Sequence, residues 1–478
     1  MSNILKKYNN LSITLKASIW FVFCSFMQKG ISIITTPIFT RLMNATEFGK
    51  YNVFNSWENI IIIFVSLHIA AGAYTQGLIK YESNQKKYSS SMIGLTIVLY
   101  FCWFILYIVF RDGINNLLSM KTSYMIVMFI CMFMYSIFAF WSSEQRVNYN
   151  YKKLVIITIL STILNPALGI VLMNFIEDKV FARILGTCIA WTLSYIWIIF
   201  KQLYSGKLFY SKFYWLHALK FNIPLIPHYL SQTILNSSDK IMIDKMIGNS
   251  QAGIYGLAYS VSLTMTLFNN ALSHAITPWI YKKIRENKIS DISNISNILL
   301  LIIAFLNILL IAFAPEVIKL FAPGEYYEAI YVIPPIAMSV YFMFLYELFS
   351  KFEFYFEKTK LIAVATFLGA IINLILNFLF IKIYGYIAAG YTTLVCYMLY
   401  SIFHYIFMRK ICKENCNNVQ PYDIKKCVII TIIFLLISFI FLFLYNHLFI
   451  RYVFILILVS TFICKKHIII DYIKKIIQ

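Results

Sequence analysis

Long apolar segments alternate with short polar ones along almost the whole chain, and this pattern predicts membrane-spanning helices. Segments such as IIIFVSLHIAAGA and CVIITIIFLLISFIFLFLY approach or reach the roughly 20 residues that cross a hydrocarbon core of about 30 Å. A transmembrane barrel would instead show short segments of alternating polarity, so the pattern favours an all-α polytopic membrane protein. We predict about 14 spans, near 16–40, 51–74, 89–110, 122–142, 153–175, 181–200, 221–246, 252–278, 293–314, 327–350, 359–381, 385–408, 426–446 and 449–464.

Composition supports the same class of protein. Of the 478 residues, 60% are hydrophobic and 13% are charged, whereas a soluble chain carries about a quarter charged residues. The 9 cysteines are scattered and match no zinc-binding pattern. We therefore expect no metal site and no cofactor.

The distribution of basic residues predicts the orientation of the chain. With a cytoplasmic N-terminus, 29 of the 41 Lys and Arg residues fall in cytoplasmic segments, 10 fall on the opposite side, and Lys29 and Lys240 lie within spans. This bias follows the positive-inside rule, so both termini are predicted to be cytoplasmic. It also accounts for the net charge of +21 without a nucleic-acid partner.

A short internal repeat suggests the domain organisation. RLMNATEFGKY from Arg41 aligns with KMIGNSQAGIY from Lys245, and both sequences follow the exit of a predicted span. Six spans separate the two copies, so both halves enter the membrane in the same orientation, as parallel repeats do in several transporter folds. The predicted parts are an N-terminal six-helix bundle (1–204), an amphipathic cytoplasmic linker (205–220), a C-terminal six-helix bundle (221–408), and a basic loop with two further helices and a tail (409–478).

Motifs that would indicate an enzyme are missing from the sequence. GNSQAG has the two glycines of a P-loop, but Ile254 and Tyr255 stand where Lys and Ser or Thr are required. The chain contains no HExxH and no G-x-S-x-G motif, and no loop is long enough for a separate catalytic domain. These observations favour a transporter over an enzyme.

Polar residues recur at helical spacing inside several spans, which places each set on one helical face. The main sets are Ser25, Gln28, Lys29, Ser32 and Thr36 in the first span, Asn52, Asn55, Glu58 and Asn59 in the second, and His228, Gln232, Asn236, Asp239 and Lys240 in the seventh. The neutral residues fit helix–helix hydrogen bonding and a shared central cavity equally well. A charge such as Lys29 or Glu58 usually faces a wet cavity or a partner, whereas Asp239 and Lys240 also fit mutual pairing or snorkelling near the outer leaflet. Pro334-Pro335 is the strongest candidate for a kink within a span.

Three segments carry a resemblance to a known family. Phe221–Val261, the segment RLMNATEFGKYNVF, and Tyr326–Lys360 are similar to the corresponding regions of Wzx-type polysaccharide flippases. These proteins belong to the multidrug/oligosaccharidyl-lipid/polysaccharide superfamily. The resemblance extends over most of residues 10–408.

The resemblance implies that the chain moves oligosaccharide repeat units, linked to undecaprenyl diphosphate, from the cytoplasmic to the outer leaflet of a bacterial inner membrane. The product would be an O-antigen, capsule or exopolysaccharide, and a polysaccharide polymerase and a chain-length regulator would be partners. The residues expected to line a cationic substrate cavity are Lys29, Gln28, Ser32, Arg41, Gln232, Asn236 and Lys240. Glu58 and Asp239 are candidates for binding a coupling proton or sodium ion.

Two other functions remain open on the sequence alone. A cation-coupled exporter of small molecules, similar to the MATE transporters of the same superfamily, would have the same fold. A membrane-embedded polysaccharide polymerase would have a similar number of spans, but it would need a sizeable outer loop that this chain lacks.

Overall fold

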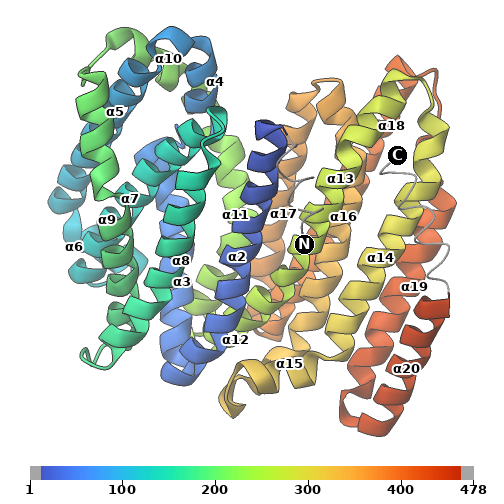
Figure 1. The fold of residues 1–478 in the computed structure, drawn as a ribbon. Helices are drawn as coiled ribbons and strands as arrows, with labels where there is room; N and C mark the ends of the chain where they lie inside the picture. The colour runs from blue at the N-terminus through green and yellow to red at the C-terminus, as the bar shows by residue number, and fades with distance from the viewer. Residues whose placement is uncertain (1–11, 465–478) are drawn as a thin grey trace, which may run out of the picture. The chain divides into compact units, whose positions relative to one another are not determined.

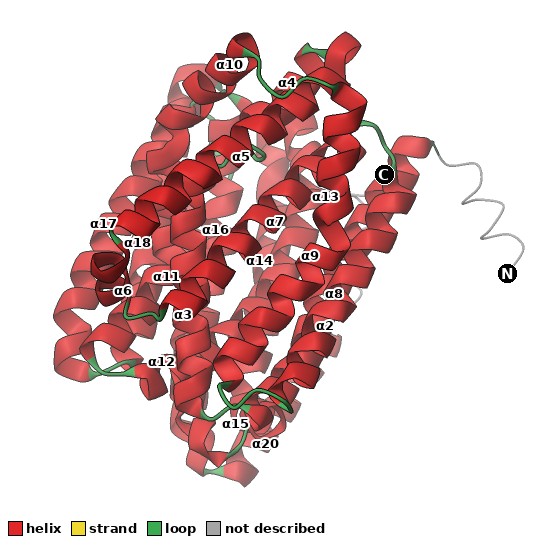
Figure 2. Cartoon of the chain, turned by 90° about the vertical axis from the view of Figure 1, so that its left-hand side faces the viewer, coloured by secondary structure: helices red, strands yellow, loops and turns green. Residues whose placement is uncertain are grey.

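The computed structural model describes residues 12–464, and all the regular structure within that range is helical (Figure 1; Figure 2). Ten of the described helices are long and apolar enough to cross a membrane, which confirms the prediction of an all-α polytopic membrane protein. Six of the lysines that the charge count assigns to the cytoplasmic side lie outside the described residues, namely Lys6, Lys7, Lys465, Lys466, Lys474 and Lys475.

The chain forms two compact units, Met1–Thr233 and Ile234–Gln478. The division falls inside α11. The domain boundaries expected from the sequence, at 204, 220 and 408, stay a prediction. The first unit contains α2 (Ile13–Leu42), α3 (Ala45–Ser66), α4 (Ala73–Lys80), η1 (Glu82–Asn84), α5 (Gln85–Val109), α6 (Arg111–Leu118), α7 (Thr122–Val147), α8 (Tyr151–Met173), α9 (Lys179–Gly206), α10 (Lys212–Asn222) and η2 (Ile223–Leu225).

Helix α11 (Ile226–Met246) continues from the first unit into the second. The rest of the second unit contains α12 (Asn249–Ser262), η3 (Leu263–Met265), α13 (Thr266–Arg285), η4 (Ile289–Asp291), α14 (Ile292–Ala312), α15 (Ala314–Phe321), η5 (Gly324–Tyr331), α16 (Ile333–Tyr355), α17 (Thr359–Tyr384), α18 (Ile387–Asn415), α19 (Ile424–Phe443), η6 (Leu444–Asn446) and α20 (Leu448–Cys464).

The repeat seen in the sequence has a structural counterpart. Helices α2 and α11 end at Leu42 and Met246, and the next helices begin at Ala45 and Asn249. Both pairs differ by the 204 residues that separate the two copies in the sequence. The repeated segments therefore form the same helix–turn–helix junction, one in each unit.

The second predicted span is not a single helix, which corrects the expectation of a continuous span over 51–74. Helix α3 ends at Ser66, and Leu67 and His68 adopt left-handed backbone conformations with φ of 48° and 50°. The Ser66 hydroxyl accepts the His68 N–H at 3.1 Å and thereby satisfies one backbone group at the break. Helix α4 then resumes at Ala73, so the apolar sequence continues through a break in the helix.

Pro334 and Pro335 do not kink a helix, contrary to the prediction. They occupy the first turn of α16, which begins at Ile333. The first turn leaves backbone N–H groups without helical acceptors, and proline lacks an N–H and has φ already set for a helix. The two prolines therefore start α16 after η5.

The predicted amphipathic linker contains helix α10, which packs on α4 and α5 through aromatic residues. The Tyr214 ring lies 5.2 Å from that of Tyr88, and the Trp215 indole N–H donates to the Ser91 carbonyl at 2.9 Å. Phe213 is 65% exposed although its ring centre lies 5.7 Å from that of Tyr81. A helix that packs through aromatic residues and leaves an aromatic ring partly exposed is suited to a membrane interface.

Helices α8 and α9 pack closely at two glycines. A Cβ on Gly186 of α9 would lie 2.5 Å from the backbone nitrogen of Gly169 on α8. The two backbones therefore approach as closely as small residues allow. This contact fixes the position of α9, which carries one of the charged groups of the candidate site.

We expect Gly186→Ala to lower the unfolding free energy by about 1–3 kcal/mol, because the added methyl group would force the two backbones apart. Thermal unfolding of the purified protein in detergent would measure this loss. Gly113→Ala in α6 is the control, since its Cβ would meet no atom within 4 Å. An unchanged melting temperature in Gly186→Ala would contradict the close α8–α9 contact.

The two C-terminal helices are integral to the second unit. The Tyr445 hydroxyl donates to the Ile311 carbonyl at 2.8 Å, which ties the end of α19 to α14. On α20, Arg451 is 1% exposed and pairs with Glu316 of α15, and the Tyr452 hydroxyl donates to the same carboxylate at 3.0 Å. Helices α19 and α20 therefore belong to the packed body of this unit.

Candidate functional site

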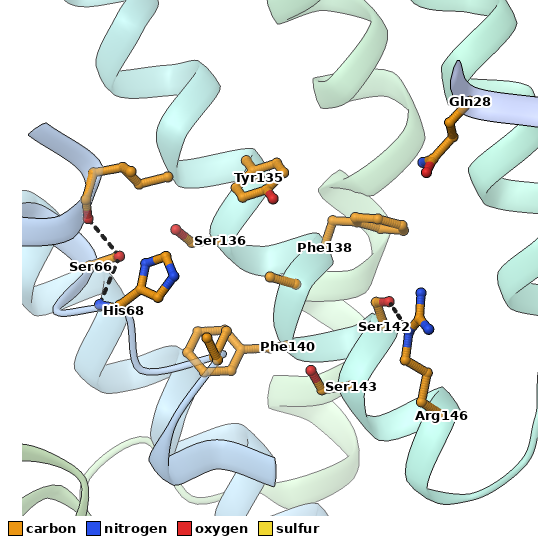
Figure 3. A pocket seen from close by; sticks show the side chains of 14 residues that line it. Gln28, Ser66, His68, Tyr135, Ser136, Phe138, Phe140, Ser142, Ser143 and Arg146 are labelled. Atoms are coloured by element: carbon orange, nitrogen blue, oxygen red, sulfur yellow. Dashed lines mark hydrogen bonds between the residues drawn. The ribbon is translucent and has the colours of Figure 1, made fainter. Parts of the chain in front are cut away.

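Two adjoining cavities lie in the first unit, with volumes of about 360 Å³ and about 270 Å³. Gln28 of α2 and Tyr135 and Phe138 of α7 line both of them. We call the two together the N-unit cavity. Figure 3 shows its larger part, where hydroxyl, amide, imidazole and guanidinium groups alternate with aromatic rings.

Arg183 of α9 lies at the smaller part of the N-unit cavity and is 8% exposed. Its guanidinium Nη1 donates to the Asn165 side-chain oxygen at 2.7 Å and to the Thr187 hydroxyl at 3.0 Å. The Phe39 ring centre lies 4.2 Å from the guanidinium carbon, within cation–π range.

Three features of this arrangement leave Arg183 available to an anion. The described residues place no carboxylate in an ion pair with it, and its buried Nε has no hydrogen-bond partner. A Cβ on Gly169 would lie 3.1 Å from the guanidinium, so the glycine provides the space in which it lies. Neutral partners orient the group without neutralising its charge.

Arg146, near the end of α7, lines the larger part of the N-unit cavity. Its guanidinium carbon lies 4.8 Å from the Phe21 ring centre, and its Nε donates to the Ser142 hydroxyl at 3.4 Å (Figure 3). Arg146 is exposed, whereas Arg183 is buried. The cavity thus has one accessible and one buried guanidinium.

The break between α3 and α4 contributes to the larger part of the cavity. Ser66, His68, Ala70 and Ala71 line it, and the His68 ring lies 4.6 Å from that of Tyr229. Interrupted helices in membrane proteins occur where irregular backbone lines a cavity. The break therefore exposes polar backbone groups next to the polar side chains.

The cavity contains some of the residues predicted from the first span. Gln28 and Ser32 line it. Lys29 is exposed on α2 and is not among the lining residues of either part, and Arg41 donates to the Pro37 carbonyl at 2.8 Å at the end of that helix. The roles of Lys29 and Arg41 stay predictions.

Sequence reasoning missed the two arginines because it counted both among the charges of the connections, Arg146 on the cytoplasmic side and Arg183 on the opposite side. A usable signal was present on α9, since Arg183 and Thr187 are four residues apart and therefore share a helical face. Arg146 gave no comparable signal, because a basic residue at the end of a span is the usual topogenic charge.

Glu58, predicted as an ion-coupling residue, lies on α3 near the N-unit cavity. It is close enough to Cys188 of α9 and to the cavity residue Tyr135 to interact electrostatically with both. Its side chain is half-buried. The carboxyl group therefore lies beside the cavity but is not among its lining residues.

In the second unit, Asp239 of α11 is 1% exposed and accepts three hydrogen bonds. The Tyr255 hydroxyl donates to its Oδ2 at 2.6 Å, the Thr393 hydroxyl donates to Oδ2 at 2.8 Å, and the Asn377 amide donates to Oδ1 at 2.6 Å. The Asn377 amide also donates to the Asn373 side-chain oxygen at 3.2 Å. We call these five residues the Asp239 cluster.

The other predicted residues of α11 lie beside this cluster. The Tyr259 and Tyr397 hydroxyls donate to the Asn236 side-chain oxygen at 3.3 and 3.4 Å, and the Lys240 ammonium lies 4.4 Å from the Tyr259 ring centre. Gln232, one turn earlier, is exposed. Because Lys240 follows Asp239 directly and interacts with it electrostatically, the alternative of mutual pairing remains open for these two residues.

These two groups of residues are suited to binding ions and sugars. In the N-unit cavity, guanidinium groups match phosphate oxygens, while the amides and hydroxyls match sugar hydroxyls. In the Asp239 cluster, a buried carboxylate beside two hydroxyl oxygens and two side-chain amides matches a proton or a hard cation such as sodium.

Comparison with known proteins identifies relatives of this chain. Residues 14–284 match the family described as "Polysaccharide biosynthesis protein", and residues 224–379 match the family described as "MatE". "Lsg locus putative protein 1" of Haemophilus influenzae is 20% identical over 371 residues, which cover 75% of this chain and 88% of that protein. "Probable low-salt glycan biosynthesis flippase Agl15" of Haloferax volcanii is 27% identical over 172 residues, or 35% of this chain and 36% of that protein.

A solved structure has the same fold. "Lipid II flippase MurJ, inward closed conformation" superimposes with a TM-score of 0.68 and 16% sequence identity, covering 91% of this chain and 100% of that one. The similarity extends over both units.

Proposed function

Since this chain belongs to the polysaccharide biosynthesis protein family, we propose that it is a flippase for lipid-linked oligosaccharides. It moves repeat units attached to undecaprenyl diphosphate from the cytoplasmic to the outer leaflet of a bacterial inner membrane. The repeat units are then used to assemble a surface polysaccharide, such as an O-antigen, capsule or exopolysaccharide.

The buried guanidinium of Arg183 is the observation that carries this proposal. Keeping a charge within a membrane protein is costly unless the charge has a partner or faces a wet cavity. Arg183 has neutral hydrogen-bond partners and lines the N-unit cavity. An anionic group of the substrate supplies the missing counter-charge, and the diphosphate is the anion common to all substrates of this class.

We assign roles to the remaining residues on the same chemical grounds. Arg146 attracts the diphosphate from the accessible part of the cavity, and Gln28 and Ser32 donate hydrogen bonds to diphosphate or sugar oxygens. Lys29, Arg41, Gln232, Asn236 and Lys240 remain candidate substrate contacts. The polyprenyl tail stays in lipid while the head group crosses by alternating access between two conformations.

Asp239 is our first candidate for ion coupling, and Glu58 is the second. The Asp239 carboxylate lies among hydroxyl and amide groups that could bind a cation with their oxygens. Binding of sodium or a proton there compensates a buried negative charge and so favours one conformation of the carrier. We place both chain termini on the cytoplasmic side, with a polysaccharide polymerase and a chain-length regulator as partners.

The proposal is tested in a strain that lacks this protein. We expect single lipid-linked repeat units to accumulate facing the cytoplasm, because the polymer is made on the other side of the membrane. The measurement combines extraction of lipid-linked glycans, labelling with a membrane-impermeant reagent to establish sidedness, and quantification of surface polysaccharide.

The same measurements separate the alternatives. Normal outward exposure of single units with failed chain growth would indicate a polymerase. An unchanged glycan profile would contradict the flippase and favour a cation-coupled exporter of small molecules, a candidate that the match of residues 224–379 to the MatE family supports. Sensitivity of the deletion strain to cationic drugs would then test that exporter.

A further inference from the structure

A second buried carboxyl group in the second unit, which is not part of the Asp239 cluster, is paired with a histidine. Glu353 of α16 and His404 of α18 are both 0% exposed, and the His404 Nδ1 lies 2.7 Å from the Glu353 Oε1. The other polar atom of each side chain, Oε2 of Glu353 and Nε2 of His404, is buried without a hydrogen-bond partner. None of the functions described above uses this pair.

Aromatic rings surround the imidazole. The Tyr346 ring stacks on it at 5.3 Å, and the Tyr400 ring meets it edge-on at 4.4 Å. The Tyr400 hydroxyl shares a hydrogen bond with Thr366 of α17. Among the described residues, the titratable rings that pack against the imidazole are those of these two tyrosines, from α16 and α18. Neither tyrosine carries a charge at neutral pH.

The nearest basic residues along the two helices are held by other partners. The Lys351 ammonium donates to the Ser273 hydroxyl of α13 at 2.6 Å, and Arg409 donates to the Asn418 side-chain oxygen at 3.0 Å. No cation among the described residues forms an ion pair with Glu353 apart from His404 itself. The charge of the carboxylate must therefore be balanced within the pair.

This balance depends on a single proton. With a neutral imidazole and an ionised carboxyl group, the pair would carry one uncompensated negative charge in a fully buried site lined by aromatic rings, which is very costly. Addition of one proton, either to the imidazole or to the carboxyl group, makes the pair electrically neutral. We propose that Glu353 and His404 together form a proton-binding site, which takes up one proton when buried and releases it when water reaches the pair.

Nitrogen NMR of the purified full-length carrier, with ¹⁵N-labelled histidine, tests the site directly. The chain has only 7 histidines, and His404→Gln identifies the relevant signals by their loss. We expect the His404 nitrogen signals of the wild type to change in a single step as pH is varied, either because the ring gains a proton or because protonation of the carboxyl group alters the hydrogen bond at Nδ1. In Glu353→Gln, which keeps the shape of the side chain but cannot ionise, we expect this step to be lost from the same pH range.

Two results would overturn the proposal. One is a set of His404 nitrogen signals that does not change with pH throughout the range in which the protein remains folded. The other is a titration that is identical in Glu353→Gln. If either variant fails to fold, the wild-type titration still decides the question, with Tyr346→Leu or Tyr400→Leu, which each remove one ring packed against the imidazole, used to assign the signals. The test uses no glycan, so its failure is distinguishable from a failure of the flippase proposal.

Discussion

Arg183→Ala should reduce export of lipid-linked repeat units by roughly 10- to 100-fold, the effect of losing a charged hydrogen bond of about 1.5–3 kcal/mol. The charge lost is the buried one of the N-unit cavity. Export is measured as surface polysaccharide and as the outward-facing fraction of lipid-linked units, in a deletion strain that carries the variant. Arg183→Lys should restore only part of the activity, because an ammonium lacks the planar set of donors of a guanidinium.

Two further variants make this result interpretable. Arg111→Ala changes the same residue type at an exposed position in α6, where the arginine pairs only with the exposed Asp112, and it should leave export unchanged. Lys29→Ala tests the cation that the sequence predicts. Normal export in Arg183→Ala with loss of export in Lys29→Ala would move the diphosphate site to Lys29, whereas normal export in both variants would remove the diphosphate role from both cations.

Asp239→Asn should abolish the response of transport to its coupling ion and lower export by about tenfold or more, which corresponds to about 1.4 kcal/mol. Asparagine has nearly the same shape as aspartate, so the fold should persist. It has no charge, however, and it presents an amide group to the Asn377 amide that donates to Asp239 in the wild type. Without the negative charge, and with an amide group in its place, the cluster should no longer bind a cation.

Thermal unfolding of the purified protein identifies the ion. If the cluster binds sodium, replacing choline chloride by sodium chloride at constant ionic strength should raise the melting temperature of the wild type but not of Asp239→Asn. If it binds a proton, sodium should have no effect, and the pH dependence of stability should change in the variant. Asp112→Asn, at a side chain that is 81% exposed, is the control. Export at the wild-type level in Asp239→Asn would contradict the coupling role.

The sequence predicted the helices well where one physical rule dominates. Long apolar stretches must be helical in lipid, so the span predicted at 122–142 lies within α7, Thr122–Val147. The repeat also placed the junctions after α2 and α11 at equivalent positions, where both helices end and the next ones begin with the same spacing. The helix bounds match although the caps differ, since Asn44 caps α3 with its side chain and Gly248 precedes α12 without a side-chain cap. The lengths of these helices depend on residues that are close together in the sequence.

Features that depend on distant residues could not be predicted in this way. The start of α4 is fixed by Asn222, 149 residues later, whose side-chain oxygen accepts the Ala73 N–H at 3.3 Å. A Cβ on Gly72 would lie 2.1 Å from that oxygen, so any larger residue at this position would displace the Asn222 side chain that bonds to the start of α4. The sequence stays apolar through this break, so its hydropathy contains no information about such a contact.

The candidate site shows the same contrast between features set by neighbouring residues and features set by distant ones. Gln28, Ser32 and Asp239 were identified because polar residues at helical spacing are conspicuous in an apolar span. Arg183 was counted as a topogenic charge, because its sequence position near the end of a span does not reveal that Asn165 and Gly169 of α8 hold it in a cavity. Its partners belong to another helix, so only the packed structure reveals them.

The pairing of Arg451 with Glu316 has a consequence for the synthesis of this protein. Glu316 leaves the ribosome 135 residues before its arginine, so the partly inserted chain holds a carboxylate with no compensating charge until α20 enters the membrane. During that interval α15 lacks this contact, so the described packing of the second unit can be completed only after α20 has been made.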